Sequence, residues 1–366
     1  MRTVFIGAHE EPNGVNSYTY NLALELKKRG KESTVISFGS CNKKTEYNGV
    51  PIKQYKTIGG TMTSIPLLYL MSLPYLIKHR KEIDIVMYQT VMFSVIPSLI
   101  ISLCGLKSCS IIHSLAEDSP KRGVFMKFIL KLCTKVSLLF QKNTITVSYA
   151  KAEEIFNRYH KKCEVIPCGV YMPEDKVIKS NILKQNNIIE GKYFLTIGRI
   201  DPIKNYETLI DAFKKHEHGS YKLVIAGDYN NSYGNSLVKR ANSCKDIIFI
   251  GSVQGDTKAA LLKHCFAYCL VSSSEGLPIA LLEGLSYGKI PIVTQIPAIK
   301  EVLSKYHVGL WSRVHDVDDL IKNMLTIETD YDSLKWQEET AKDIIRQNYT
   351  WPHICDLYLK FCTKIK

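Results

Sequence analysis

Residues 267–284 read AYCLVSSSEGLPIALLEG, and this stretch contains a strand, a polar turn and the start of a helix. The apolar run at 267–271 predicts a buried strand, and Pro278 is of a residue type favoured at the first position of a helix. A short apolar strand followed directly by a helix is the repeating unit of a parallel α/β sheet. The stretch therefore predicts a strand–turn–helix unit whose polar turn lies at the carboxyl end of the strand.

The same unit recurs along the chain in two sets. A Pro-Cys-Gly turn at 167–169 and a polar segment near 174–191 separate the sets. Alternating strands and helices predict an α/β fold with doubly wound parallel sheets, and two sets predict two such domains with a cleft between them. The predicted strands are 3–6, 33–37, 84–88, 110–113 and 144–147 in the first set, and 193–197, 222–226, 247–250, 267–271 and 290–294 in the second.

The positive charge is concentrated in the first half. The chain has 366 residues and a formal net charge of +13, and residues 1–170 hold 23 Lys and Arg against 12 Asp and Glu. Residues 171–366 hold 25 against 23 and are nearly neutral. One half is therefore expected to meet an anion, with nucleic acid, a membrane surface and a phosphorylated substrate as the candidates.

The cysteines and the apolar stretches indicate a cytosolic protein. The eleven cysteines are odd in number, show no Cys-x-x-Cys spacing and mostly stand in apolar runs, which favours reduced thiols. The first apolar run is too short for a signal peptide. The uncharged stretches 57–77 and 85–106 are long enough to cross a bilayer, but both contain prolines and polar residues. We expect the second to form a strand, a loop and a buried helix that ends at Leu106.

Two cations bracket the turn after the predicted strand 193–197. Arg199 and Lys204 stand between this strand and the predicted helix 206–215, so both can reach one position at the edge of the sheet. Such a pair can neutralise a diphosphate, with directed hydrogen bonds from arginine and a mobile charge from lysine. The alternative is a solvated loop with two surface cations.

Two carboxylates flank the helix start in the opening stretch. Glu275 precedes Pro278, and Glu283 follows on the helix, where exposed backbone N–H groups also favour an anion. Paired carboxylates at this place suit recognition of sugar or ribose hydroxyls better than metal binding. The alternative is that Glu275 caps the helix and Glu283 is an ordinary surface residue.

A further polar loop, residues 10–17, follows the first predicted strand. Gly14 in this loop lets the backbone approach a phosphate, but the Gly-x-Gly-x-x-Gly pattern of nicotinamide-binding domains is absent. A plain turn is the alternative.

These motifs resemble those of glycosyltransferase family 4, the retaining, sugar-nucleotide-dependent enzymes of GT-B fold. The Glu-x7-Glu block at Glu275 and Glu283 and the Gly-Arg-x4-Lys block at Arg199 and Lys204 occur in the order of that family. The chain departs from the pattern at Asn13, where a glycine is usual. The resemblance implies two Rossmann-like domains facing across a cleft. It assigns 1–170 with the C-terminal helix 351–366 to the acceptor and 171–350 to the nucleotide sugar.

The resemblance also implies a role for each motif residue. His113 would face the transferred sugar, Arg199 and Lys204 would stabilise the leaving diphosphate, and Glu275 would hold sugar hydroxyls. Glu283 would bind the ribose. The remaining donor contacts, largely from the backbone, would come from Gly14, Val253, Gly276, Leu277 and Pro278, where Leu277 replaces the aromatic residue that the family often has. From the sequence alone, His113 can equally be a histidine whose hydrogen bonds are satisfied at a strand end.

The segment 120–142 predicts an amphipathic helix with a lysine stripe. Lys127, Lys131 and Lys135 fall on one side, apolar residues gather on the far side, and no acidic residue occurs from 119 to 151. This pattern is typical of a helix that lies on an anionic membrane surface. The alternative is a core helix with its apolar face inward. The sequence lacks zinc-finger spacings and recognition-helix signals, so we expect no nucleic acid partner.

The resemblance, together with these features, implies a retaining glycosyltransferase that moves a sugar from a nucleotide sugar to a saccharide acceptor, expected to be lipid-linked. Its place would be the biosynthesis of a capsule, O-antigen or exopolysaccharide, in the cytoplasm and peripheral on the inner face of the membrane. No Asp-x-Asp metal clamp stands out, so we expect neither a divalent metal nor a cofactor. The alternatives are a sugar-nucleotide epimerase of GT-B type and a catalytically silent, membrane-peripheral binding protein.

Overall fold

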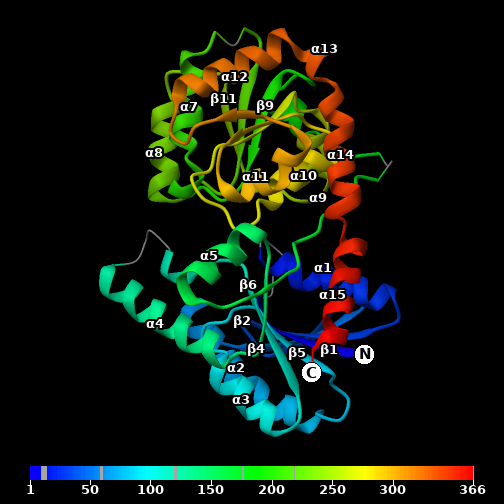
Figure 1. Cartoon of the computed structure of the whole chain (residues 1–366). Coiled ribbons are helices and arrows are strands. Elements are labelled where there is room, and N and C mark those ends of the chain that lie inside the picture. The colour runs from blue at the N-terminus through cyan, green and yellow to red at the C-terminus, as the bar shows by residue number, and fades with distance from the viewer. Residues whose placement is uncertain (10–14, 58–60, 119–122, 175–176, 218, 366) are drawn as a thin grey trace. The chain divides into compact units, whose positions relative to one another are not determined.

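The chain forms two compact units. The computed structural model describes residues 1–9, 15–57, 61–118, 123–174, 177–217 and 219–365. The first unit comprises Met1–Gly169 and Trp351–Lys366, and the second comprises Val170–Thr350 (Figure 1). The C-terminal helix α15 (Trp351–Lys364) therefore belongs to the unit that contains the N-terminus.

The first unit is built on a sheet with the strand order β3-β4-β2-β1-β5-β6-β7-β8. All neighbouring strands are parallel except β3 and β4, which form an antiparallel hairpin at one edge. The bounds are β1 Arg2–His9, β2 Glu32–Gly39, β3 Lys43–Tyr47, β4 Val50–Lys56, β5 Ile85–Tyr88, β6 Lys107–Ile112, β7 Asn143–Thr146 and β8 Glu164–Val165.

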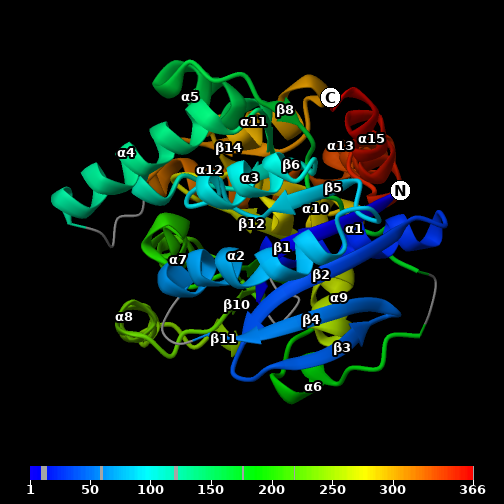
Figure 2. The same ribbon diagram turned by 90° about the horizontal axis from the view of Figure 1, so that it is seen from below.

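Helices cover both faces of this sheet. The connections through α2 (Thr61–Lys78), α3 (Val95–Leu103) and α4 (Val124–Phe140) all cross the sheet in one direction, whereas α1 (Val15–Lys28) crosses in the other. Because such crossovers are right-handed, α2, α3 and α4 lie on one face and α1 on the opposite face. α3 contacts both α2 and α4, and α15 packs against α1 (Figure 2). The remaining elements are η1 Ala116–Asp118 and α5 Tyr149–Tyr159.

The second unit contains a fully parallel sheet with the strand order β11-β10-β9-β12-β13-β14. The chain first builds outward from β9 to β10 and β11, and then returns to place β12 on the other side of β9. The strand order therefore reverses between β9 and β12. The bounds are β9 Tyr193–Ile197, β10 Lys222–Ala226, β11 Ile247–Gly251, β12 Ala267–Leu270, β13 Pro291–Thr294 and β14 Leu310–Ser312.

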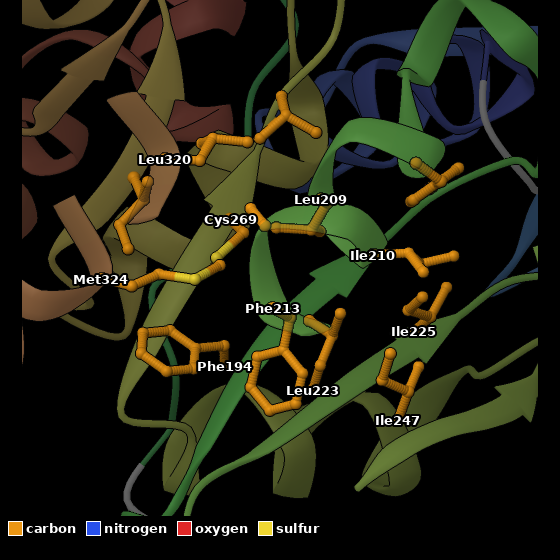
Figure 3. Close-up of a cluster of buried hydrophobic side chains, with 14 of the residues drawn as sticks. Phe194, Leu209, Ile210, Phe213, Leu223, Ile225, Ile247, Cys269, Leu320 and Met324 are labelled. Carbon is orange, nitrogen blue, oxygen red and sulfur yellow. The ribbon is translucent and has the colours of Figure 1, made fainter. Parts of the chain in front are cut away.

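One apolar core of this unit lies between the sheet and the helices α7, α8 and α12. Phe213 on α7 packs against Phe194 on β9 with ring centroids 6.3 Å apart, and Leu320 and Met324 on α12 close the same cluster (Figure 3). These side chains are fully buried, so the carboxyl ends of the strands are held on a rigid support. The helices are α6 Ile182–Gln185, η2 Pro202–Lys204, α7 Tyr206–Lys215, α8 Ser232–Ala241, α9 Gly255–His264, α10 Ile279–Ser286, α11 Pro297–Leu303, η3 Ser304–Tyr306, α12 Val317–Thr329, α13 Tyr331–Leu334 and α14 Trp336–Asn348.

The fold confirms the predicted α/β class with two doubly wound sheets, and each predicted strand is present within a few residues. The sequence patterns missed the β3–β4 hairpin, the short edge strand β8 and β14. β3 is almost entirely exposed, and β8 and β14 are only two and three residues long, so these strands carry little apolar signal. β4 alternates its buried residues with exposed or half-buried ones and so lacks a continuous apolar run.

One prediction for the first unit was wrong. The helix expected to be buried up to Leu106 ends at Leu103, and its outer side is exposed. Ile96, Leu99 and Leu103 are 64%, 48% and 91% exposed. Only the side that faces the sheet is buried, because α3 lies in an outer layer. Among the described residues, no helix has both the length and the hydropathy needed to cross a membrane.

Candidate active site

The loops after β9 and β12 meet at the point where the strand order of the second unit reverses. Ligands of open parallel sheets bind beyond the carboxyl ends of the strands at such a switch point. The backbone N–H of Ser273 donates to the carbonyl oxygen of Ile203 at 2.9 Å, and the Ser273 hydroxyl donates to the same oxygen at 3.1 Å. These bonds fasten the two loops that carry the predicted cations and carboxylate.

Lys204 and Glu275 form an ion pair across these loops. Lys204 Nζ donates to Glu275 Oε1 at 2.5 Å, and the Ser272 hydroxyl donates to the same oxygen at 2.6 Å. The two charged side chains are only 14% and 11% exposed, so water screens their attraction weakly. The proposed capping role of Glu275 is not observed, since the N-cap of α10 is Pro278 and no side chain caps that helix.

Asn205, which the sequence patterns missed, fixes the turn that presents Lys204. Its backbone is left-handed with φ 54°, a conformation that asparagine tolerates better than most residues. Its amide Nδ2 donates to the carbonyl oxygen of Val271 at 3.2 Å, and its Oδ1 accepts from the Thr208 hydroxyl at 2.6 Å. His315 Nδ1 lies 2.8 Å from the same Oδ1. The buried amide therefore ties the lysine turn to the end of β12.

Arg199 follows β9 directly and is exposed. The turn beside it packs tightly, because the Gly198 N–H donates to the carbonyl oxygen of Ala226 at 2.9 Å. A Cβ atom on the next residue, Gly227, would stand 2.1 Å from the Gly198 oxygen, so only glycine fits there. Gly227 is a second structural requirement that sequence patterns did not reveal.

The second predicted carboxylate, Glu283, also has a cationic partner. Lys258 Nζ on α9 donates to Glu283 Oε1 at 2.6 Å, and both side chains are partly exposed. Lys258 was not predicted, because nothing in its sequence position links it to a residue on another helix. Glu275 and Glu283 therefore stand in separate ion pairs.

The other predicted donor contacts lie near these pairs in the chain. Gly276 is half-buried, Leu277 and Pro278 are buried, and Val253 is half-buried between β11 and α9. The buried Leu277 side chain is directed into the protein, which leaves its backbone as the group for any ligand contact. α10 lies close to β12, because a Cβ on Gly284 would approach the Tyr268 ring to 2.8 Å.

His113 lies in the first unit, directly after β6, and its imidazole is neutral at pH 7. Burial lowers its pKa to about 4, and the Tyr18 ring packs edge-on against it with centroids 5.3 Å apart. Its Nε2 lies 3.2 Å from Gln89 Oε1. With that oxygen as the acceptor, the imidazole carries its proton on Nε2.

Gln89 is a further residue that the sequence patterns did not single out. It follows β5, where the strand order of the first sheet reverses, and it is 6% exposed. Its Nε2 has no hydrogen-bond partner within the part of the chain that the structure describes. A buried amide N–H without an acceptor lowers the stability of the folded protein, unless a bound ligand accepts its hydrogen bond. Gly14, the remaining predicted donor contact, lies outside the described residues.

The helix α4 turns most of its apolar residues outward, whereas the core-helix alternative placed its apolar face inward. Its buried residues are Leu130, Thr134, Ser137 and Leu138, and the Thr134 hydroxyl donates to buried Glu117 Oε2 at 3.2 Å. The apolar residues on the other side are exposed, with Phe125 at 77% and Leu132 at 54%. The alternative of an inward apolar face was therefore wrong. Lys131 and Lys135 are exposed and Lys127 is half-buried.

Comparison with known families identifies the chain. The model described as "Glycosyltransferase Family 4" matches residues 12–172, and the model described as "Glycosyl transferases group 1" matches residues 178–351. The fold and the two matches define a glycosyltransferase of GT-B fold. The chain belongs to the group 1 glycosyltransferases, with a first domain of the family 4 type.

Individual relatives and solved structures agree with this assignment. An uncharacterized glycosyltransferase of Methanocaldococcus jannaschii is 27% identical over 57% of each chain. The O-antigen chain mannosyltransferase of Salmonella typhimurium is 29% identical over 51% of this chain and 50% of its own. The chain thus spans between half and three-fifths of the length of these relatives. The Anabaena protein HepE, solved with UDP, covers 100% of both chains with a TM-score of 0.79 at 15% identity, which shows the shared fold.

Proposed function

We propose that this glycosyltransferase is a retaining enzyme that transfers a sugar from a nucleotide sugar to a saccharide acceptor. The observation that carries the proposal is the Lys204–Glu275 ion pair at the switch point of the second sheet, with Arg199 in the loop that also carries Lys204. Cations there can meet the charge of a departing diphosphate, and a carboxylate can accept hydrogen bonds from sugar hydroxyls. HepE, a structural neighbour, has been solved with UDP and with UDP-glucose, which supports a donor of this class.

The proposed chemistry breaks the bond between the anomeric carbon and the diphosphate oxygen. The bonding electron pair leaves with the nucleoside diphosphate, where Arg199 and Lys204 stabilise the growing negative charge. The acceptor hydroxyl oxygen forms the new bond on the same face of the sugar, and its proton passes to the departing diphosphate oxygen. With its Nε2 proton donated to Gln89 Oε1, neutral His113 would offer Nδ1 as an acceptor to a sugar hydroxyl.

We propose a lipid-linked saccharide as the acceptor. A relative from Campylobacter jejuni, 23% identical over 68% of this chain, is named for transfer of N-acetylgalactosamine to a diphospho-undecaprenol-linked sugar. The Salmonella relative is named for O-antigen chains. These names support a role in building a cell-surface polysaccharide such as a capsule, an O-antigen or an exopolysaccharide.

The basic first half supports attachment to an anionic membrane on the cytoplasmic face. Lys127, Lys131 and Lys135 line one border of α4, where they can contact lipid phosphates. Flotation with vesicles containing phosphatidylglycerol tests this. We expect the triple Lys→Ala variant to lose binding at low salt, and unchanged binding would contradict the role of these lysines.

Transfer is tested by screening nucleotide sugars by thermal shift and then measuring release of nucleoside diphosphate. A transferase releases it only when an acceptor is present, and the Glu275→Gln variant should lose this release. An epimerase would convert the sugar nucleotide without an acceptor. A silent binding protein would release nothing with any donor and acceptor pair, and this result would overturn the proposal.

A further inference from the structure

The first unit exposes an unusual amount of apolar surface on three helices. Among the described residues, 22 large apolar side chains are exposed, and 14 of them lie on α2, α3 and α4. Single exposed apolar residues are ordinary, but a contiguous group marks an interaction site. The group consists of Leu67, Leu70, Ile96, Leu99, Leu103, Val124, Phe125, Met126, Phe128, Ile129, Leu132, Val136, Leu139 and Phe140.

These helices form one layer. The right-handed crossovers place α2, α3 and α4 on the same face of the first sheet, and α3 contacts the other two (Figures 1 and 2). The sheet side of α2 and α3 fills the core through Leu68, Leu76 and Ile101. Their other side faces away from the sheet. Its leucines and isoleucine therefore belong to the surface of the protein and not to its interior.

The charge pattern of the layer is equally specific. Residues 57–77 and 85–106 hold no charged residue. These ranges include the whole of α3 and all of α2 except its last residue. Apart from Lys78 at the end of α2, the lysines of the layer stand on α4, where Lys127, Lys131 and Lys135 border its exposed phenylalanines. An apolar expanse with a cationic border fits a bilayer, whose acyl chains lie beneath anionic phosphates.

The inward side of α4 explains why its apolar side is free. Thr134 and Ser137 face the protein, and Thr134 bonds to Glu117, which also accepts a hydrogen bond from the Tyr159 hydroxyl. Rotating the helix to bury its phenylalanines would expose Leu130 and Leu138 and leave the buried Glu117 without its Thr134 donor. The outward apolar side is thus fixed by packing.

We propose that α2, α3 and α4 form a single membrane-docking face. The apolar side chains of all three helices enter the acyl-chain region of an anionic bilayer, and the α4 lysines contact the phosphates. This inference rests on the membrane attachment proposed for the α4 lysines and extends the contact to two further helices, α2 and α3. A second copy of the chain is a poorer occupant, because a symmetric dimer through this face would bring two rows of lysines together.

The docking face is tested with single tryptophan probes and brominated lipids. The variants Leu70→Trp, Leu103→Trp and Phe128→Trp place a probe on α2, α3 and α4. Leu325→Trp is the matched control, because Leu325 is 51% exposed but lies on α12 in the second unit. Each variant is mixed with phosphatidylcholine–phosphatidylglycerol vesicles with and without brominated acyl chains. The signal of the three native tryptophans is subtracted with the wild-type protein.

We expect added quenching at positions 70, 103 and 128 and none at position 325. Quenching at 128 alone would overturn the three-helix face and leave the lysine attachment standing. Quenching at none of them, with wild-type protein still floating with vesicles, would limit the contact to headgroups and also overturn it. Dimerisation in solution that Leu103→Glu abolishes would assign the face to a second copy.

A second measurement separates insertion from folding and from catalysis. Leu99→Glu with Leu103→Glu should lower vesicle partitioning at least tenfold, and Leu325→Glu should leave it unchanged. Both proteins should keep the wild-type melting temperature, because these positions are exposed. Turnover with a water-soluble acceptor should also persist. If the wild-type protein itself showed no turnover, the proposed transfer would be contradicted, but the docking face would not.

Discussion

The helices α10 and α4 each follow a strand of a parallel sheet, yet they orient their apolar sides differently. α10 buries Leu281, Leu282 and Leu285, and Gly284 lets it approach the Tyr268 ring. α4 buries Thr134 and Ser137 and exposes its phenylalanines. The sheet in the second unit offers an apolar surface to α10, whereas η1 offers buried Glu117 to α4. An amphipathic pattern therefore predicts a helix with two faces but not which face is inside.

The difference also separates two tasks. The loop before the tightly packed α10 carries Glu275, which is fixed in place by its hydrogen bond to Lys204. The outward apolar face of α4 adds nothing to the core and is free to meet another surface. We therefore expect changes around α10 to affect catalysis and stability, and changes on the outside of α4 to affect association.

The largest effect is expected at the loop between β9 and α7, where Lys204 pairs with Glu275 of the loop before α10. Lys204→Ala removes a cation aimed at the departing diphosphate and should lower kcat about 10²–10³-fold. Steady-state release of nucleoside diphosphate measures it. Lys322→Ala, an exposed lysine on α12, is the control with unchanged turnover. Wild-type kcat in the Lys204 variant would show that catalysis does not depend on this loop.

The second effect compares the packing of the two helices directly. Gly284→Val drives a branched side chain into the Tyr268 ring and should lower the free energy of unfolding by about 1–3 kcal/mol. Leu132→Ser on the exposed side of α4 should change it by no more than about 0.5 kcal/mol. Urea unfolding measures both. Equal losses would mean that the outer side of α4 is packed in solution.

A smaller effect concerns pH and His113, which precedes η1 and α4. Burial lowers the pKa of this imidazole from 6.5 to about 4. Between these values the unfolded chain binds a proton that the folded protein does not, so stability falls as the pH drops from 6.5 to 4. His113→Asn should remove this part of the fall in melting temperature. An identical pH profile in the variant would contradict the buried, neutral state.

Gln89→Glu sharpens the same test. A carboxylate 3.2 Å from Nε2 should raise the pKa of His113, and NMR titration of the imidazole measures the change. Gln89→Met is the uncharged control and should not raise it. An unmoved pKa in the glutamate variant would show that the two side chains do not pair in solution.

The smallest expected effect is none at all. We predict that EDTA leaves transfer unchanged, since the proposed partners of the diphosphate are Arg199 and Lys204. Among the described residues, no group of three or more His, Cys, Asp and Glu side chains is placed to hold a metal ion. Activity that is lost with EDTA and restored by Mg²⁺ or Mn²⁺ would show that Arg199 and Lys204 are not sufficient and that a metal ion also meets the diphosphate charge.

The candidate site was partly predictable from the sequence. Arg199, Lys204 and Glu275 were found because each follows an apolar strand, and strand ends converge at a switch point. Asn205, Gly227, Lys258 and Gln89 were missed. Their roles depend on partners far away in the chain, such as the carbonyl oxygen of Val271 for Asn205 and Glu283 for Lys258. No local pattern contains that information.

The amino-acid sequence by itself determined the alternation of strands and helices, the division into two sheets and the positions of the charged motifs. These follow from the spacing of apolar residues and from chain order, which are local properties. Only the tertiary structure paired Lys204 with Glu275, 71 residues apart, and turned the apolar side of α4 outward. Both depend on which distant groups remain to be satisfied once the sheets have formed, and buried polar groups such as Glu117 then decide the orientation.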